Sequence, residues 1–237
     1  MNKSSSLRSI STANRIDNLP DAILCHILSF LPTKQAATTN VLSKRWKSVW
    51  LYVPALDFDD ENFKDFPSCR KFIKSTFTLR DKHDSIRSFS FKCGRHSRFT
   101  QKQYDAYLKK AMQYAVENLT FNMAKKVKHS KLPDRIFSFK MLQVLKLTNM
   151  EPGHFDQLDF PHLKTLHLNS ISFISHEDIV KFLLGCPILE NLQSQVYPYG
   201  IIENLNALPN LVKVRVIGLN TPMALICKTK ILHIEEV

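Results

Sequence analysis

Histidine and cysteine are among the residues of this sequence that could bind a metal ion or act in catalysis. Cys93 and His96 have the spacing of two metal ligands, but no third or fourth ligand is evident, so a basic loop is the favoured interpretation. His176 is followed by Glu177, without the second histidine that a helical zinc motif carries four positions later. The sequence also contains no G-x-S-x-G and no G-x-x-x-x-G-K-[ST] motif. We therefore expect no catalytic residue, no metal ion and no cofactor.

The five cysteine residues are scattered and show no C-x-x-C spacing. An odd number without paired spacing supports neither a disulfide framework nor a zinc site. Reduced thiols are typical of the cytoplasm and the nucleus, which are the expected locations. No apolar run reaches about 18 residues, so no membrane span is predicted. Residues 1–14 are rich in serine and lack the apolar core of a secretory signal, so we expect a disordered tail there.

The net charge of +12 is concentrated in the middle third of the chain. Residues 61–140 carry 19 basic and 7 acidic residues, whereas residues 1–60 carry 7 and 5, and residues 141–237 carry 7 and 9. A basic band can attract acidic proteins or nucleic acid, but a solvated surface is the favoured interpretation. Trp46 and Trp50 could stack on nucleic-acid bases. Their spacing of four places them on one helix face, where packing within the protein is favoured.

The elements that would position a binding surface begin after the tail, with three short helices predicted in residues 15–52. Pro20 and Asp21 suit the first turn of a helix, and apolar residues then recur with helical spacing from Ile23 to Leu31. Pro32 ends this helix. Thr33 can cap a second helix over residues 34–39, and Ser43 can cap a third that carries residues 44–50. These helices are too short to bury all their apolar groups, so part of the apolar stripe is expected to face either a partner or the rest of the chain.

These residues resemble the F-box. The resemblance rests on the pairs Leu19-Pro20, Ile23-Leu24, Ile27-Leu28 and Leu31-Pro32, followed by Val41-Leu42-Ser43-Lys44-Arg45-Trp46 and Trp50. It implies binding to a Skp-type adaptor, and through it to the cullin and RING subunits of a ubiquitin ligase. The adaptor contacts implied by the resemblance are Leu19, Pro20, Leu24, Ile27, Leu28, Leu31, Pro32, Val41 and Trp46.

Residues 53–237 contain a repeated pattern of the form apolar-x-x-apolar-x-apolar. Clear copies begin at Leu142, Leu163 and Leu211, and Leu189 begins a copy with Ser194 at its third apolar place. Weaker copies begin at residues 53, 86 and 116, and a half-match joins residues 232 and 234. The spacings of 33, 30, 26, 21, 26 and 22 residues are typical of leucine-rich repeats with irregular ends. Each unit is expected to form a short strand and to return through a helix or loop, and the last repeat is expected to be incomplete.

The return segments fit this interpretation and extend the resemblance. Residues 103–118 have helical spacing, and His176 opens a helix that Gly185 stops. The chain is similar to the plant F-box/leucine-rich-repeat family of the FBD-associated type, without an evident FBD domain. The resemblance rests on the order of an F-box, residues 132–137 and the repeat at Leu142, and on the segment 185–190. The expected fold class is therefore α/β, with an F-box followed by a solenoid arc whose parallel sheet lines the concave face. An ordinary α/β domain is the alternative.

The expected function is recognition of a target protein for a cullin–RING ubiquitin ligase, by a receptor that is not itself an enzyme. The fifth position of each repeat points away from the apolar side of the strand. These positions are Asp57, Ser90, Thr120, Lys146, His167, Gln193, Arg215 and, in the half-match, His233. We expect Lys146, His167, Gln193 and Arg215 to contact the target. The alternatives are a nucleic-acid-binding protein and a truncated receptor that binds no target.

Overall fold

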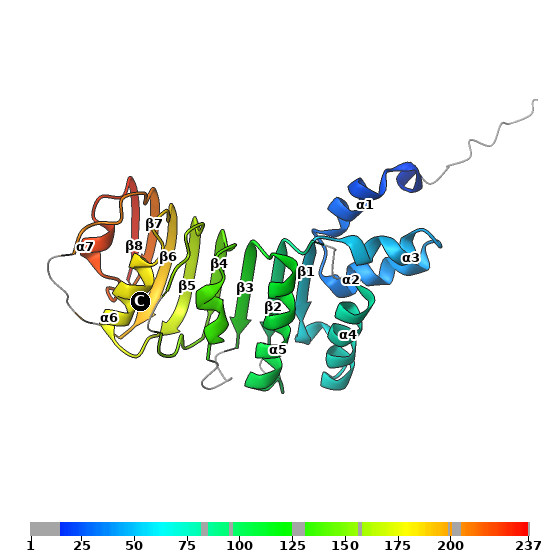
Figure 1. Cartoon of the computed structure of the whole chain (residues 1–237), viewed down its shortest axis with the longest axis horizontal. Helices are drawn as coiled ribbons and strands as arrows, with labels where there is room; N and C mark the ends of the chain where they lie inside the picture. The colour runs from blue at the N-terminus through cyan, green and yellow to red at the C-terminus, as the bar shows by residue number, and fades with distance from the viewer. Residues whose placement is uncertain are drawn as a thin grey trace, which may run out of the picture.

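The computed structural model describes residues 15–81, 85–94, 97–124, 131–155, 158–198, 200 and 205–236. These residues form a helical module followed by one sheet of eight strands, which pair in chain order from β1 (Ala55–Asp59) to β8 (Ile231–Glu235) (Figure 1). Every pairing in this sheet is parallel. The expected fold class, a helical module followed by an arc of leucine-rich repeats, is confirmed. The predicted tail at residues 1–14 and His96 lie outside the described residues.

The helical module is built from short helices with tight turns between them. They are η1 (Arg15–Asn18), α1 (Asp21–Leu28), α2 (Thr33–Thr38), η2 (Thr39–Val41), α3 (Trp46–Val49) and η3 (Trp50–Tyr52). The predicted first helix was three residues too long, because the chain already turns after Leu28. The predicted cap at Thr33 was wrong, since Pro32 occupies the cap position and the Thr33 hydroxyl accepts a hydrogen bond from the Asp57 N–H at 2.7 Å.

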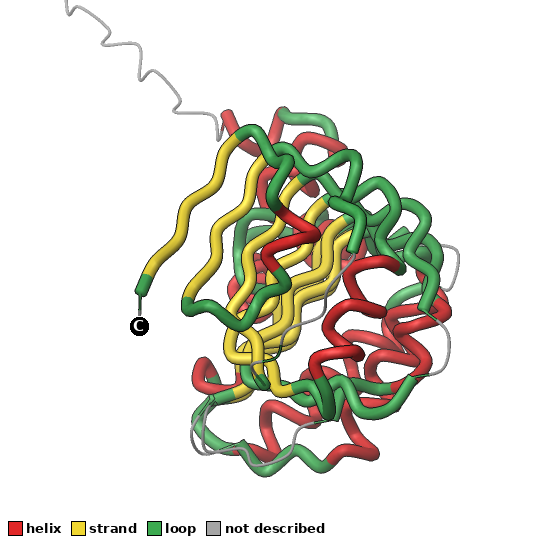
Figure 2. Tube along the Cα trace, turned by 90° about the vertical axis from the view of Figure 1, so that its left-hand side faces the viewer, coloured by secondary structure: helices red, strands yellow, loops and turns green. Residues whose placement is uncertain are grey.

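All the apolar patterns of the sequence, including the weak copies and the half-match, form strands. Between the two edge strands lie β2 (Ser88–Cys93), β3 (Asn118–Met123), β4 (Val144–Thr148), β5 (Thr165–Ser172), β6 (Asn191–Tyr197) and β7 (Lys213–Ile217). Alternate residues of β1 to β7 point to a buried side and an open side, as a strand requires, with one interruption in β5, where the register shifts between Asn169 and Ile171. Figure 2 shows the helices of the repeats gathered along one side of the row of strands, so the opposite side of the sheet is open.

The segments that return from one strand to the next contain most of the remaining helices. These are η4 (Asp60–Asn62), α4 (Phe66–Leu79), α5 (Gln101–Ala111), η5 (Met112–Tyr114), η6 (Asp134–Ser138), α6 (His176–Leu184) and α7 (Met223–Ile226). Helix α4 was not predicted, although Asp65 caps it by accepting a hydrogen bond from the Ser68 N–H at 2.8 Å. Helix α5 begins at a capping box formed by Thr100 and Gln103.

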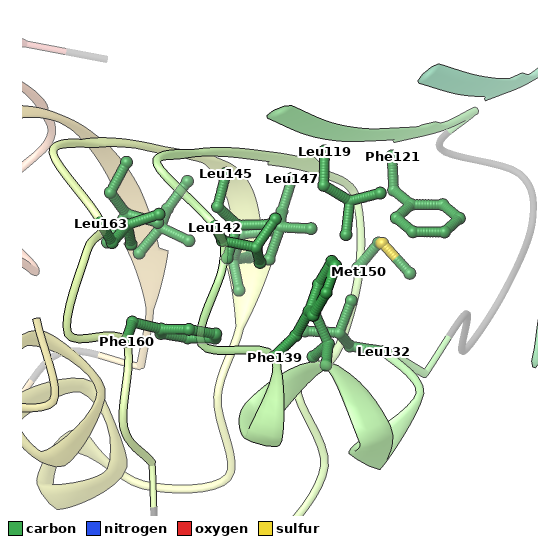
Figure 3. Close-up of a cluster of buried hydrophobic side chains, with 14 of the residues drawn as sticks. Leu119, Phe121, Leu132, Phe139, Leu142, Leu145, Leu147, Met150, Phe160 and Leu163 are labelled. Carbon is green, nitrogen blue, oxygen red and sulfur yellow. The ribbon is translucent and has the colours of Figure 1, made fainter. Parts of the chain in front are cut away.

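The buried sides of the strands form one continuous core with the inner faces of these helices. Leu145 and Leu147 of β4 follow Leu119 and Phe121 of β3, and this succession is visible in Figure 3. Ser194, at the apolar place of its repeat, is buried, and its hydroxyl oxygen accepts a hydrogen bond from the hydroxyl of Thr221 at 2.7 Å. This bond gives each of the two buried hydroxyl groups a hydrogen-bond partner, which explains how a polar residue is tolerated there.

Arg80 connects the helical module to the first repeat. Its side chain is buried directly after α4, and its Nη2 donates hydrogen bonds to the Val53 carbonyl at 2.8 Å and the Trp50 carbonyl at 3.2 Å. The Trp50 ring also stacks on Phe72 of α4, with 6.5 Å between the ring centroids. The end of the module is therefore held by both a charge-assisted bond and an aromatic contact.

The two edges of the sheet differ in how they are covered. At β1 the module supplies the Thr33 hydroxyl to the Asp57 N–H, and Leu56 and Phe58 are each only 1% exposed. At β8 the equivalent residues Leu232 and Ile234 are 39% and 45% exposed. The module thus acts as the cover that a solenoid end needs, and β8 has no such cover among the described residues.

We predict that Arg80→Met uncouples the module from the repeats. The Trp50 and Val53 carbonyls would lose a donor, at about 1–3 kcal/mol for a buried group. Both tryptophans of the chain lie in the module, so tryptophan fluorescence reports the module while far-ultraviolet circular dichroism reports the whole chain. The two urea-unfolding curves should coincide in the unaltered protein and separate in the variant. Arg87→Met, at an exposed position, is the matched control, and coincident curves in both variants would contradict the prediction.

We also predict that β8 exchanges its amide hydrogens fastest of the eight strands. The described residues leave its outer edge uncovered and its side chains exposed, so local opening should cost less free energy there than in β4 or β5. Hydrogen–deuterium exchange followed by mass spectrometry measures this. Equal protection of β8 and β4 would show that exposure does not determine the stability of this end.

Candidate interaction surfaces

The first candidate surface is a set of exposed apolar side chains on the helical module, named here the apolar patch. Its members are at least one-third exposed: Ile16, Ile23, Ile27, Phe30, Leu31, Val41 and Leu42. Val41 is 82% and Phe30 is 75% exposed. Scattered exposed apolar residues are ordinary, but seven within 27 consecutive residues indicate a surface that a partner covers.

Helix α1 divides its apolar stripe between the module core and the apolar patch. Leu24 and Leu28 are buried against Val49 and Trp50, whereas Ile23 and Ile27 remain exposed on the other side of the stripe. The stripe is thus wider than the area that the module can cover, which leaves one edge available for a partner.

A charged contact fixes the start of this helix. The Arg45 guanidinium donates hydrogen bonds from Nε and Nη2 to the Asp21 carboxylate at 2.8 and 2.6 Å, and Nη2 also bonds the Leu19 carbonyl. Because this pair is solvent-exposed, we assign it a role in orienting α1 rather than a large contribution to stability.

The nine predicted adaptor contacts separate into three groups. Leu24, Leu28 and Trp46 are at most 2% exposed and belong to the module core, so as placed they offer no surface to a partner. Leu19 and Pro32 are half-buried, and Leu19 packs against that core. Pro20, Ile27, Leu31 and Val41 are exposed.

Sequence reasoning missed Ile16, Ile23, Phe30 and Leu42 as members of the apolar patch. The helical spacing gave Ile23 the same weight as Leu24, and the sequence contains no signal for which of the two is buried. Phe30 lies after the last residue of α1, where helical spacing no longer predicts the direction of a side chain.

The second candidate surface is the polar row on the open side of the sheet, made of the fifth residues of the repeats. The strand pairings place Asp57, Ser90, Thr120, Lys146, His167, Gln193, Arg215 and His233 in one register across all eight strands. At about 4.8 Å between neighbouring strands the row is about 34 Å long. The sequence pattern therefore predicted the alignment of this row correctly, while its role in binding stays a prediction.

Charges at the two ends of the polar row are neutralised by neighbouring residues on the open side. The Lys92 ammonium lies 3.2 Å from the Asp57 carboxylate, and the Arg215 guanidinium lies 2.8 Å from the Glu235 carboxylate. The hydrogen bond and charge of Arg215 hold the pKa of Glu235 below its usual value. Asp57 and Arg215 therefore present no unneutralised charge on the open side of the sheet.

The middle of the polar row carries Lys146 and His167 on adjacent strands. Lys146 is exposed and forms no ion pair with another described residue. Partial burial lowers the pKa of His167, and the positive charge of Lys146 lowers this pKa further. On one side of this middle region lie the uncharged hydrogen-bonding residues Thr148, Asn169 and Gln195, and on the other side Thr165 and Asn191 lie beside the apolar Val144. This region can bind an extended backbone through hydrogen bonds and a carboxylate through Lys146.

The residues considered for metal chemistry do not form a site in the described part of the chain. Among those residues, no group of three or more histidine, cysteine, aspartate and glutamate side chains is placed to hold a metal ion. Burial raises the pKa of the Cys93 thiol to about 12, so the thiolate that a metal ion requires is disfavoured. No helix in the described ranges is long and apolar enough to cross a membrane.

Comparison with known proteins identifies the two parts of the chain. The F-box domain model matches residues 16–56, and the model of the leucine-rich repeats of the FBD-associated F-box protein At5g56370 matches residues 104–219. No solved structure matches the chain.

Several proteins of Arabidopsis thaliana are similar over three quarters of the chain. The putative F-box/LRR-repeat protein At5g41840 is 34% identical over 202 residues, covering 76% of this chain and 37% of the relative. The F-box/LRR-repeat protein At3g59190 is 34% identical over 193 residues, covering 75% and 48%. The probable FBD-associated F-box protein At1g32375 is 33% identical over 192 residues, covering 78% and 45%. The chain thus spans less than half the length of these relatives, and its two parts resemble, in the same order, the F-box and the repeats of the plant F-box/leucine-rich-repeat family, of the FBD-associated type.

Proposed function

We propose that this chain is the target-recognition subunit of a cullin–RING ubiquitin ligase. The apolar patch docks a Skp-type adaptor, which brings the cullin and RING subunits, and the repeats bind a target protein. The observation that carries the proposal is the exposed apolar patch within a module that matches the F-box domain. The receptor has no catalytic residue of its own in this proposal, which agrees with the non-catalytic role of its family.

The burial of the module supports a revised set of adaptor contacts. Ile27, Leu31 and Val41, from the expected set, are joined by the newly found members of the apolar patch. Covering an apolar side chain completely stabilises a complex by roughly 1.5–3 kcal/mol, and part of this is offset by the cost of association. Several such residues are therefore needed for a stable complex, and seven are present.

The polar row supports the proposed target site. It lies on the side of the sheet that the repeat helices leave open, and its length of about 34 Å suits an extended segment or the flank of a small domain (Figure 2). Lys146, His167 and Gln193 lie side by side on β4, β5 and β6. A target that places a carboxylate between Lys146 and His167 would meet a cation and a hydrogen-bonding imidazole.

The rigid junction at Arg80 gives the two surfaces a fixed relation. A ligase must hold its target at a set distance from the transferred ubiquitin, and the hydrogen bonds of Arg80 and the Trp50–Phe72 contact keep the module from swinging against the repeats. Free thiols at all five cysteines suit the cytoplasm or nucleus, which we propose as the site of action.

The adaptor surface predicts that Ile27→Asp combined with Val41→Asp weakens adaptor binding at least about tenfold, because two carboxylates would be desolvated in an apolar interface. Titration calorimetry with a purified Skp-type adaptor measures the affinity. Ile174→Asp combined with Leu219→Asp is the matched control, since these apolar residues are 65% and 64% exposed but lie on the repeats. Leu19→Ala combined with Pro20→Ala would be a less clean test, because Leu19 also packs against the module core. Full adaptor affinity in a folded Ile27/Val41 variant would exclude the apolar patch as the adaptor-binding surface.

The polar row predicts that Lys146→Glu combined with Arg215→Glu weakens target binding while adaptor binding is unchanged. The target can be identified by photo-crosslinking from position 193 and its affinity then measured. Lys146→Glu alone is the cleaner variant, because Arg215→Glu would also place two carboxylates beside each other at Glu235. We expect a loss of about tenfold from the reversed charge. Lys228→Glu, at an exposed position away from the row, is the control. A target that binds equally well to the double variant and to His167→Ala is recognised elsewhere.

A further inference from the structure

The helices of the first two repeats carry a second charged surface, on the side of the sheet opposite the polar row. Arg70, Lys71 and Lys74 are exposed on α4, and Lys109 and Lys110 are exposed on α5. The two helices pack against each other, because the Phe77 and Tyr107 rings stack with 6.4 Å between their centroids and the Lys110 ammonium lies 5.5 Å from the Phe77 ring centre. These five exposed cations on two neighbouring helices are named here the basic face.

The described part of the chain does not neutralise the basic face. None of its five cations forms an ion pair with another described residue. Helix α4 contains no acidic residue, and the acidic residue of α5, Asp105, accepts a hydrogen bond from the Gln101 amide. Arg70 and Lys74 are four positions apart on one helix, an arrangement of like charges that destabilises the helix slightly. Such a surface favours an anionic partner that removes this repulsion.

A hollow of about 420 Å³ lies along α4 within the basic face. It is lined by Phe66, Pro67, Arg70, Lys71 and Lys74, so an apolar floor stands beside three cations. A neighbouring hollow shares Phe66 and is lined by Asp60, Glu61 and Asp65, with Lys64 beside them. The acidic hollow limits the basic face at the start of α4. An anionic chain that continued past this point would meet carboxylates.

These features favour a short acidic peptide over nucleic acid. Nucleic-acid sites commonly offer exposed rings on which bases stack. Here Phe66, in T-shaped contact with Phe99 at 4.8 Å, is the single ring among the described residues that line the hollow, and the Phe77 ring is covered by Tyr107 and Lys110, so successive bases would find no row of rings. Helix α4 has 14 residues and is about 21 Å long, which matches about six residues of extended peptide.

We propose that the basic face binds an acidic segment of a protein partner, with an apolar side chain of that segment on the floor formed by Phe66 and Pro67. The site lies beside the helical module, since Phe72 of α4 contacts Trp50 of the module. It is separate from the apolar patch and from the polar row, so a partner can occupy it while an adaptor and a target are bound. The proposal goes beyond the proposed function and does not depend on it.

The test uses the full chain and three labelled probes in fluorescence anisotropy. The first probe is a peptide of about eight residues made of aspartate and glutamate around a central leucine, and the second replaces the acidic residues by asparagine and glutamine. The third is a uridine oligonucleotide of about the same length. The acidic peptide should bind, the neutral peptide should not, and the affinity of the acidic peptide should fall as NaCl rises from about 50 to about 300 mM.

Matched variants assign the binding to the basic face. Arg70→Glu, Lys71→Glu and Lys74→Glu together should weaken the acidic peptide at least about tenfold. The control is the triple variant Lys213→Glu, Lys228→Glu and Lys230→Glu, which changes the net charge by the same amount at exposed positions near the other end of the sheet. It should change the affinity for the acidic peptide less than about twofold. A second variant changes the same three α4 residues to Gln, because neutral side chains that favour a helix remove the positive charges with less risk to folding.

Three further results would support or overturn the proposal. Replacing the central leucine of the peptide by glycine should weaken binding, and an unchanged affinity would overturn the assignment to the hollow. Equal losses in the two charge-reversal variants would show a general charge effect and no site. Tighter binding of the oligonucleotide, lost in the α4 variants, would make nucleic acid the occupant and overturn the acidic-peptide proposal.

Discussion

The structure depends on the fact that no single repeat can bury its own apolar face. A strand such as β4 presents Leu145 and Leu147 to one side, and these residues leave water only because β3, β5 and the return segments surround them (Figure 3). Stacking therefore forces every strand into the same register. That register aligns the buried residues into one core and, as a direct consequence, aligns the fifth residues of the repeats on the open side. The polar row and the core are two results of the same constraint.

The helical module contributes to the solenoid as well as to the proposed docking of an adaptor. It covers the β1 edge through the Thr33 hydroxyl and is held there by Arg80 and the Trp50–Phe72 stack. A sheet edge without such a cover exposes both backbone groups and apolar side chains, as Leu232 shows at β8. Joining the module through a buried contact rather than a flexible linker thus satisfies two requirements at once. It closes one end of the core and gives the apolar patch a fixed position relative to the polar row.

Sequence reasoning succeeded where a pattern follows directly from a repeat and failed where burial depends on neighbouring elements. All eight strands were located, because the spacing of leucine and phenylalanine is the physical requirement for stacking. Helix α4 was missed although it has a cap at Asp65, since its apolar residues are mixed with Arg70, Lys71 and Lys74. The third module helix is shorter than expected and begins at Trp46, because the residues after Ser43 form a turn.

The sequence alone determined the order of the elements, the repeat period and the set of residues that share the open side of the sheet. These follow from spacing, because the side chains of a strand alternate and the repeats must stack. Only the tertiary structure decided which half of the α1 stripe is buried, placing Leu24 and Leu28 inside and leaving Ile23 and Ile27 exposed. It also brought α4 and α5, which come from separate repeats, into contact through Phe77, Tyr107 and Lys110. Both outcomes depend on how helices pack across the chain, and local spacing contains no information about the neighbour that a helix will meet.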